Sequence, residues 1–375
     1  MKLLRTINFT PKWWLDEYGF ESKSPMEESL DEQIETAIKK NRALFERFGH
    51  LGIGEEDYSP DYIIPQYDGR IVAASSFGGP RPSWEKNMAC YWYDKAKGVL
   101  GDVASPGDIA RIKAPDWDNN PLLNETFERY EADKASSYFK EGRVSCPWTV
   151  ESFYDPRTSR THKTIGYMSV VDLAPFLFGD TEFFTILLEN DDFTFALLEK
   201  CYEISTSYAD YCLKHFGIDP GGLGWGSIGG DYSCILSPAQ YKKYVKPFDL
   251  RRMDENGLDY INLHSCGASA HLYSVWGEYP HRESIKMMQT RGIEGRLAHL
   301  RKCLPHTLIQ LTLHQPQCDF ENIGQSEVVD TVAGYAEEAR YDNLELVVLI
   351  VQNGENTDKN IEAFCRAVDG INERL

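Results

Sequence analysis

The chain has 375 residues, of which 42% are hydrophobic, and its 58 acidic and 39 basic side chains give a net charge of −19. A chain of this length can bury a large core as one elaborated domain. Its negative charge would repel a phosphate backbone or an anionic membrane surface, so we expect no nucleic-acid partner. No apolar run approaches the roughly 20 residues of a membrane span, and we expect a cytoplasmic protein with no membrane contact.

The nine cysteines are an odd number and are spread widely along the chain. A chain of this size does not need disulfides to stabilise its core. We therefore expect most of the cysteines to be small, buried apolar side chains.

The first 60 residues are predicted to form an N-terminal extension that packs on the rest of the chain through one helix. Ser24 is a suitable N-cap, with Pro25 at the first helical position and Glu27 at the third. Apolar residues then recur at helical spacing from Leu30 to the break around Gly49.

From residue 61 onward, short apolar runs alternate with amphipathic stretches, which is typical of repeated β-α units. The strand candidates are 61–64, 143–147, 165–171, 221–230, 258–264, 284–289, 307–313 and 345–352. Helices are predicted at 238–256, 294–303, 326–340 and 359–374. Eight strands is the number of a (β/α)8 fold, so we predict a single TIM barrel over residues 61–375. The long stretches 69–125 and 154–164 are expected as loops at its C-terminal face.

The strand predicted at 258–264 ends in the run His264-Ser265-Cys266-Gly267. In a barrel of this kind the active site forms at the C-terminal ends of the strands. Alternation along an extended segment sends His264 and Cys266 to the same side, and imidazole and thiolate are donors that zinc prefers. The pair predicts a zinc site that needs a third ligand. The alternative is a hydrogen-bonded histidine and a packed cysteine, with Gly267 present only for a turn.

Cys318 is the predicted third metal ligand, because it is the only other cysteine expected just beyond a strand end in this half of the chain. His314, at the end of the same strand, is the competing candidate. Alternatively, both residues merely line a loop.

A carboxylate and a phenol follow the glycine-rich strand predicted at 221–230. Asp231 could orient a substrate or act as an acid or base, and Tyr232 lies next to it, so both are predicted catalytic residues. The alternative role for Asp231 is capping, because a helix start at Ser237-Pro238 follows closely.

Five further residues are predicted to bind the substrate. Trp148 and Trp225 are placed to line a flat-sided apolar pocket, and Asn262, Gln352 and Asn353 lie at or near strand ends. No GxxxxGK[ST] loop or GxSxG elbow occurs, and no GxGxxG leads from a strand into a helix. Phosphoryl transfer and serine hydrolysis therefore have no support in the sequence.

Several of these segments, in this order, resemble the uroporphyrinogen decarboxylase superfamily. They are Gly230 to Tyr232, Leu236 to Tyr241, Val245 to Phe248 and Leu263 to Gly267, with Gly101 to Pro106, Ile109, Pro115-Asp116 and Lys359 to Ala363 in support. The resemblance extends from about residue 60 to the C-terminus and implies a (β/α)8 barrel. The superfamily contains metal-free porphyrinogen decarboxylases and zinc-dependent methyltransferases that work with a corrinoid protein.

The two branches differ in their motifs. The decarboxylases resemble one another in an arginine-rich N-terminal motif that holds the substrate's carboxylates, whereas this chain has single arginines there, at positions 5, 42, 47 and 70. The methyltransferases are similar in their His-x-Cys-Gly, which maps two zinc ligands onto His264 and Cys266. In those relatives the third ligand is a cysteine after the last strand, where this chain has Gln352-Asn353-Gly354.

The resemblance implies a methyltransferase with zinc as Lewis acid and with cobalamin carried by a separate corrinoid-binding protein. The Asp-x-His-x-x-Gly pattern that ligates cobalt is absent from this chain. The expected substrate is a small O-methyl or N-methyl compound, for example a methoxylated aromatic. A metal-free decarboxylase and a non-catalytic ligand-binding barrel are the alternatives. The sequence leaves open the direction of transfer and whether the protein is a homodimer.

Overall fold

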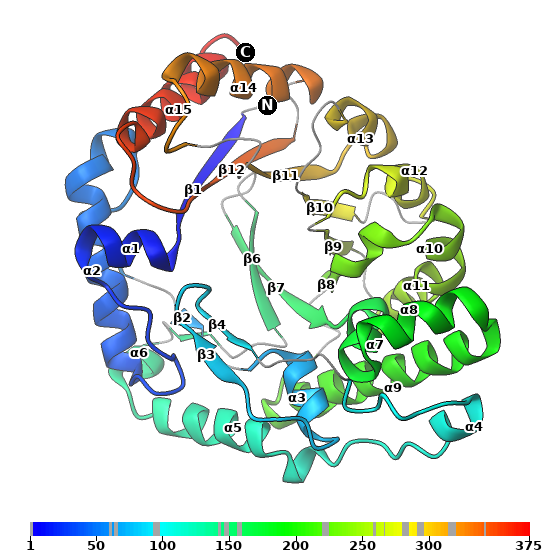
Figure 1. Ribbon diagram of the computed structural model, residues 1–375. Coiled ribbons are helices and arrows are strands. Elements are labelled where there is room, and N and C mark those ends of the chain that lie inside the picture. Colours follow the sequence, from blue (N-terminus) through cyan, green and yellow to red (C-terminus); the bar gives the residue numbers. More distant parts are fainter. Residues whose placement is uncertain are drawn as a thin grey trace.

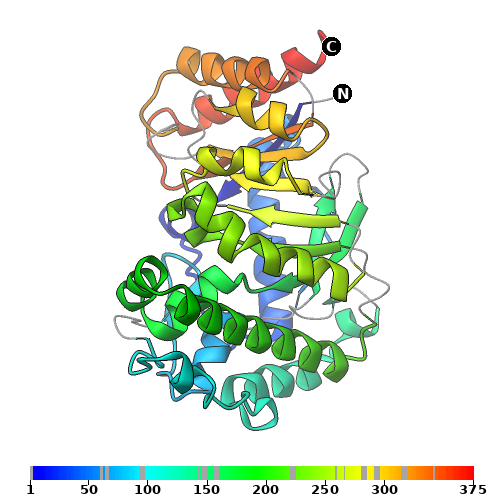
Figure 2. The same ribbon diagram turned by 90° about the vertical axis from the view of Figure 1, so that its right-hand side faces the viewer.

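A ring of helices surrounds a set of mostly parallel strands in the computed structural model of the chain (Figure 1). The structure describes residues 3–59, 62–63, 67–92, 98–141, 144–145, 150–155, 160–219, 225–257, 260–265, 267–279, 285–290, 296–313, 320–340 and 343–375. Seen from the side, helices lie along the outside of the strands (Figure 2). The fold is therefore mixed α/β, as predicted.

The main sheet has eight strands in the order β1-β12-β11-β10-β9-β8-β7-β6. Their bounds are β1 Leu4–Phe9, β6 Val150–Asp155, β7 Arg160–Tyr167, β8 Trp225–Gly229, β9 Tyr260–His264, β10 Ile285–Thr290, β11 Leu308–Leu313 and β12 Leu344–Ile350. All neighbours pair in parallel except β6 and β7, which form an antiparallel hairpin.

Two smaller sheets lie apart from the main one among the described residues. β2 (Tyr62–Ile63) pairs in parallel with β5 (Val144–Ser145), and β3 (Ser83–Glu85) pairs with β4 (Cys90–Trp92). The described pairings do not close the eight-stranded sheet on itself. The TIM barrel therefore stays a prediction.

The helices are α1 Pro11–Tyr18, α2 Leu30–Phe48, α3 Gly69–Ser75, α4 Pro106–Ile109, α5 Pro121–Asp133, α6 Ser137–Lys140, α7 Val170–Phe178, α8 Asp180–Glu189, α9 Asp191–His215, α10 Pro238–Tyr244, α11 Lys246–Glu255, α12 Tyr273–Trp276, α13 Leu297–Cys303, α14 Gln325–Glu338 and α15 Thr357–Asn372. Two predicted loops need correction. The stretch 69–125 contains α3, α4 and the start of α5, and 154–164 belongs largely to the β6-β7 hairpin. These elements are short, so their apolar periodicity is too brief to stand out in the sequence.

The N-terminal segment contributes a strand to the main sheet, which corrects the prediction that residues 1–60 are only an extension packed on its outside. β1 pairs with β12 from Leu4 opposite Glu345 to Phe9 opposite Ile350. Polar Thr6 and Asn8 alternate with apolar residues in β1, so the segment has no continuous apolar run to mark it as a strand of a parallel sheet.

The two faces of the sheet differ in polarity. Ile309 and Leu346 are buried in the apolar core on one face. On the other face, Glu345 accepts hydrogen bonds from Thr6 Oγ1 (2.6 Å) and from Gln310 Nε2 (2.9 Å). Both oxygens of this buried carboxylate therefore have a donor, as a buried charge requires. The register of the strands places Asn262 and His264 on this same polar face.

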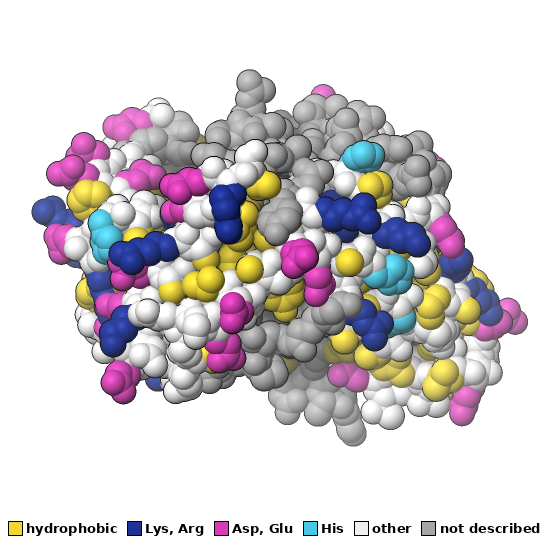
Figure 3. Space-filling view, turned by 90° about the horizontal axis from the view of Figure 1, so that it is seen from above, with side chains coloured by type: hydrophobic (Ala, Val, Ile, Leu, Met, Phe, Trp, Pro, Cys, Tyr) yellow, Lys and Arg dark blue, Asp and Glu magenta, His cyan; other side chains and the backbone are white. Residues whose placement is uncertain are grey.

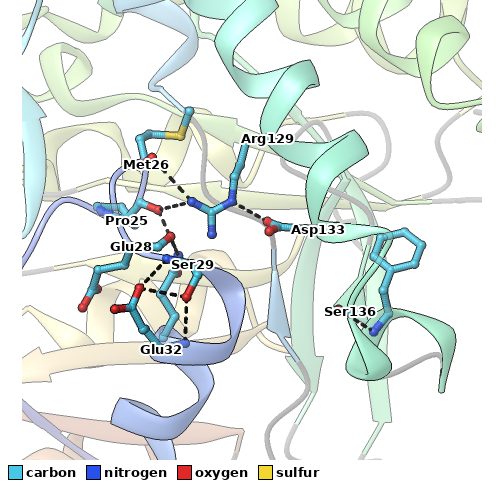
Figure 4. A network of polar contacts seen from close by, with 10 residues as sticks. Pro25, Met26, Glu28, Ser29, Glu32, Arg129, Asp133 and Ser136 are labelled. Atoms are coloured by element: carbon cyan, nitrogen blue, oxygen red, sulfur yellow. Dashed lines mark hydrogen bonds and ion pairs between the residues drawn. The ribbon is translucent and has the colours of Figure 1, made fainter.

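Helix α2 begins at Leu30, so the predicted start at Ser24 is wrong, although the helical period is confirmed. Ser29 is the N-cap, and Ser29 and Glu32 bond each other's backbone amides in a capping box. The pattern Ser-x-x-Glu occurs at both serines, so the sequence could not separate them. In the folded protein Arg129 donates hydrogen bonds to the carbonyl oxygens of Pro25 and Met26 (Figure 4). These bonds hold residues 25–26 in a turn, so the helix begins after the second serine.

Within the described part of the chain, no helix combines the length and the apolar character needed to cross a bilayer. Basic and acidic side chains are interspersed over the described surface seen from above, without one extended basic patch (Figure 3).

A buried carboxylate in α11, Asp249, makes the stability of the fold depend on pH. Asp249 accepts hydrogen bonds from the hydroxyls of Tyr279 (2.7 Å) and Tyr241 (3.2 Å). Burial nevertheless raises the pKa of Asp249 from its ordinary value of 3.8 to about 6. The folded protein therefore holds this proton more tightly than the unfolded chain does. The stability that the proton contributes is complete below about pH 4 and is lost as the pH rises through about 6.

We expect the unfolding free energy of the wild type, relative to Asp249→Asn, to fall by about 3 kcal/mol between about pH 4 and about pH 7. Urea unfolding of both proteins at each pH measures this difference. The variant cannot ionise at this position, so it controls for all other carboxylates. Parallel pH profiles for the two proteins would contradict the assignment.

Candidate active site

The last residue of β9, His264, and Asp231, the second residue after β8, meet at one end of the sheet. His264 Nε2 lies 3.2 Å from Asp231 Oδ1, and the His264 side chain is 31% exposed. Asp231 is the first residue of the short 3-10 helix η4 (Asp231–Ile235), which is separated from β8 by Gly230 alone. β8 and β9 pair in parallel with Gly229 opposite His264, so the two strands end side by side. The structure thus brings together two residues that the sequence placed on separate strand ends.

Helix η4 is held in place by a carboxylate that the sequence analysis did not single out. Asp172, in the first turn of α7, accepts hydrogen bonds from the backbone amides of Asp231 (3.1 Å) and Tyr232 (2.9 Å). It is 5% exposed. The one available signal was a lone acidic residue in the apolar run 170–178, because a buried carboxylate needs specific donors.

The charge state of Asp172 is sensitive to its surroundings. Burial raises its pKa to about 6, and the neighbouring Asp231 acts in the same direction, whereas the Tyr232 amide and the Arg70 guanidinium oppose the rise. Tyr232 donates its hydroxyl to Asp180 Oδ1 at 2.9 Å. Burial and this carboxylate raise the pKa of Tyr232, so the phenol stays protonated at neutral pH.

The guanidinium of Arg70, in α3, faces these carboxylates. Arg70 Nη2 pairs with Asp68 Oδ2 at 2.8 Å, and the guanidinium also lies over the Phe176 ring of α7. Burial opposes the charge on Arg70, but Asp68 and then Asp172 and Asp231 raise its pKa overall. The described surroundings of His264 are therefore acidic, which favours a cation over an anion.

Gly267 permits a close approach of two segments. A Cβ at Gly267 would lie 2.2 Å from Cys234 Sγ and 2.4 Å from Cys234 Cβ. A Cβ at Gly230 would instead lie 2.8 Å from Ser233 Oγ, within η4 itself. Gly267 therefore lets η4 pack directly on the segment that follows β9.

The helix start predicted at Ser237-Pro238 is confirmed, and it settles the alternative role of Asp231. Ser237 caps α10 and forms a capping box with Gln240. Asp231 therefore does not cap this helix, and its carboxylate faces His264 instead.

The other predicted site residues that the structure describes differ in their burial. Asn262 is 8% exposed, and its Oδ1 atom is buried without a hydrogen-bond partner among the described residues. Gln352 and Asn353 are exposed and follow β12. The backbone amide of Gln352 donates a hydrogen bond to Glu321 Oε1 at 3.0 Å. For Trp225 the structure gives the backbone, which pairs with Tyr260.

Four predicted site residues lie outside the described part of the chain: Trp148, Cys266, Cys318 and His314. Among the described residues, no three His, Cys, Asp or Glu side chains are grouped closely enough to hold a metal ion. The predicted zinc site is therefore neither confirmed nor contradicted.

The sequence matches no family model and no curated protein. Its fold is similar to that of solved structures, among them a methyltransferase from Methanosarcina mazei. That similarity has a TM-score of 0.52 and 13% sequence identity, and it covers 99% of this chain and 94% of that chain. At this identity the likeness shows a shared fold.

Proposed function

We propose that this chain is a zinc-dependent methyltransferase with a (β/α)8 barrel. It would remove a methyl group from a small O-methyl or N-methyl substrate and pass it to cobalamin on a separate corrinoid-binding protein. The observation that carries the proposal is the contact between His264 Nε2 and Asp231 Oδ1 at the strand ends of a fold shared with a methyltransferase. Active sites of this fold form at that end of the sheet.

One contact of His264 supports a role as a zinc ligand. A carboxylate that accepts a hydrogen bond from one imidazole nitrogen leaves the other nitrogen deprotonated, as a metal ligand must be. Asp231 is placed to do this for His264. His264 and Cys266 would hold the metal with Cys318, or with His314 in its place, and the zinc would supply Lewis-acid polarisation of the substrate's heteroatom.

The chain's own residues would orient the substrate beside this site. The Tyr232 hydroxyl remains a hydrogen-bond donor because its pKa is raised. The buried Asn262 amide lies on the His264 side of β9, where it can bind a polar group of the substrate. The rest of the substrate would be contacted by Trp148, Trp225, Gln352 and Asn353.

The acidic surroundings of His264 favour this function over a porphyrinogen decarboxylase. Among the described residues there, the cationic side chain is Arg70, and it faces three carboxylates, those of Asp68, Asp172 and Asp231. A substrate with many carboxylates needs several cationic side chains, usually arginines, to hold it. Decarboxylation is therefore the second candidate.

The proposal is tested with His264→Ala. We expect the wild type to purify with stoichiometric zinc and to methylate reduced cobalamin from methoxylated or N-methylated donors. The variant should lose both properties, with metal affinity reduced by at least about 100-fold, because it removes a ligand rather than a supporting residue. His50→Ala, at an exposed histidine in η1 (Gly49–Leu51), is the matched control and should behave as the wild type. Full zinc retention in His264→Ala would exclude the site.

A further inference from the structure

We propose that the substrate carries a protonated amino group at the end away from the transferred methyl group, and that the buried carboxylate of Glu345 binds this amine. The inference names the substrate class of the proposed methyl transfer and therefore rests on that function. It comes from the polar face of the sheet, on which the strand register places Glu345 together with Asn262 and His264.

The polar face of the sheet is its inner face. Ile309 and Leu346 on the opposite face belong to the apolar core, and the helices lie outside the strands (Figure 1). Solvent reaches the inner face. In β11 the half-buried residues are Gln310 and Thr312, which both lie on this face, whereas the other four residues of the strand are buried. In β1 the exposed residue is Asn8, which also points to this side.

Glu345 is a buried carboxylate without a cationic partner among the described residues. Thr6 Oγ1 donates to one of its oxygens and Gln310 Nε2 to the other, and both donors are neutral. An ionised carboxylate can accept about four hydrogen bonds, so each oxygen of Glu345 keeps acceptor capacity. Buried charges in proteins are paired with an opposite charge. A cationic group on a ligand would supply that charge.

A second buried group on the same face also lacks a partner. The Oδ1 atom of Asn262 is buried and has no hydrogen-bond partner among the described residues. Buried polar atoms in native proteins are nearly always satisfied, by ordered water or a bound group where the protein offers no donor. An amide oxygen only accepts hydrogen bonds, and an ammonium group only donates them. A protonated amine therefore suits the oxygens of Glu345 and Asn262 alike.

The positions of these groups set the orientation of the substrate. Asn262 and Glu345 are 8% and 5% exposed, whereas His264, two residues nearer the C-terminal end of β9, is 31% exposed. β12 is the third strand from β9, about 14 Å away along the sheet. The strands follow the curve of the helix ring, so side chains on their inner face converge (Figure 1). The amine would lie deep, between Glu345 and Asn262, and the methylated end beside His264.

This orientation agrees with the rest of the proposed site. The amine is kept away from His264, so the lone pairs of the methylated heteroatom stay available to the proposed zinc ion. The net charge of −19 attracts cationic substrates to the protein over anionic ones.

The test compares two ligands of similar shape, 3-methoxybenzylamine and 3-methoxybenzyl alcohol, by calorimetry with the full-length protein at neutral pH. No cobalamin is present, so the readout is independent of activity. We expect the wild type to bind the amine about 10- to 100-fold more tightly than the alcohol, because a buried hydrogen bond between opposite charges is stronger than a neutral one. Glu345→Gln should bind both ligands equally, whereas the control Glu337→Gln, at an exposed position in α14, should keep the preference.

Asn262→Leu is a second variant that leaves Glu345 in place, and it should weaken binding of the amine by about tenfold. A wild type that binds the alcohol as tightly as the amine would overturn the inference, as would a Glu345→Gln protein that keeps the preference. Methyl transfer from neutral donors without this preference would leave the proposed function standing. A wild type that prefers the amine but transfers no methyl group to cobalamin would overturn the function and leave the amine site.

Discussion

Replacing Asn360 by Asp is expected to destabilise the protein by about 4 kcal/mol at neutral pH, because it places an ionised carboxylate in a fully buried site that has no donor among the described residues. Asn360 is 0% exposed in the first turn of α15. Its Nδ2 atom donates to the carbonyl oxygens of Phe320 (2.7 Å) and Ile323 (2.9 Å), which fixes the turn after β11 on this helix. A carboxylate would face these two oxygens with a repulsive charge.

The matched variant Asn360→Ala should lose less, about 2 to 3 kcal/mol, because it leaves two carbonyls unpaired but introduces no charge. The two variants should also differ in their response to pH. Burial raises the pKa of the introduced carboxyl, so its penalty is present at neutral pH and shrinks as the pH falls toward about 4, where the neutral acid can donate one hydrogen bond. Urea unfolding at both pH values measures the difference. Equal losses in the two variants at neutral pH would show that the site is solvated.

If the proposed methyl transfer is the activity, replacing Asp172 by Ala should lower its rate by about 100-fold, because the residue sets the position of η4 against His264. Its two oxygens accept the amides of Asp231 and Tyr232, and no other described contact restrains both of those amides. Removal leaves two backbone donors unpaired beside the site and takes a partner from Arg70. Asp172→Asn keeps one acceptor oxygen, so its loss should be intermediate.

The control for this prediction is Asp180→Asn, which weakens the exposed contact to the Tyr232 hydroxyl and leaves the backbone of η4 anchored. It should reduce transfer by less than about tenfold. The ionised form of Asp172 is the one that accepts both amides, so transfer by the wild type should also decline as the pH is lowered through about 6. Rates measured for the four proteins across this range test both statements. If Asp172→Ala binds metal and turns over like the wild type, Asp172 does not position the site.

The sequence determined those features that depend on local periodicity and capping. Five of the predicted strands, from 221–230 to the C-terminus, overlap β8 to β12, because each is an apolar run between helical stretches. The strand predicted at 165–171 overlaps β7 only at 165–167, since α7 begins at Val170. The start of α10 at Ser237 was also evident, since an N-cap, a proline and a glutamine at fixed spacing stabilise one particular helix end. His264 was recognisable as a strand-end residue for the same local reason.

Only the tertiary structure decided which residues meet. β1 pairs with β12, although more than 300 residues of chain separate them. Pairing between strands so far apart depends on how the whole chain folds and not on any local pattern. Asp172 binds the amides of Asp231 and Tyr232, and Cys234 fills the space beside Gly267, through contacts between segments that the sequence keeps apart. The sequence could name His264 as a candidate ligand, but its neighbours follow from the packing of η4 on β9, which no single segment encodes.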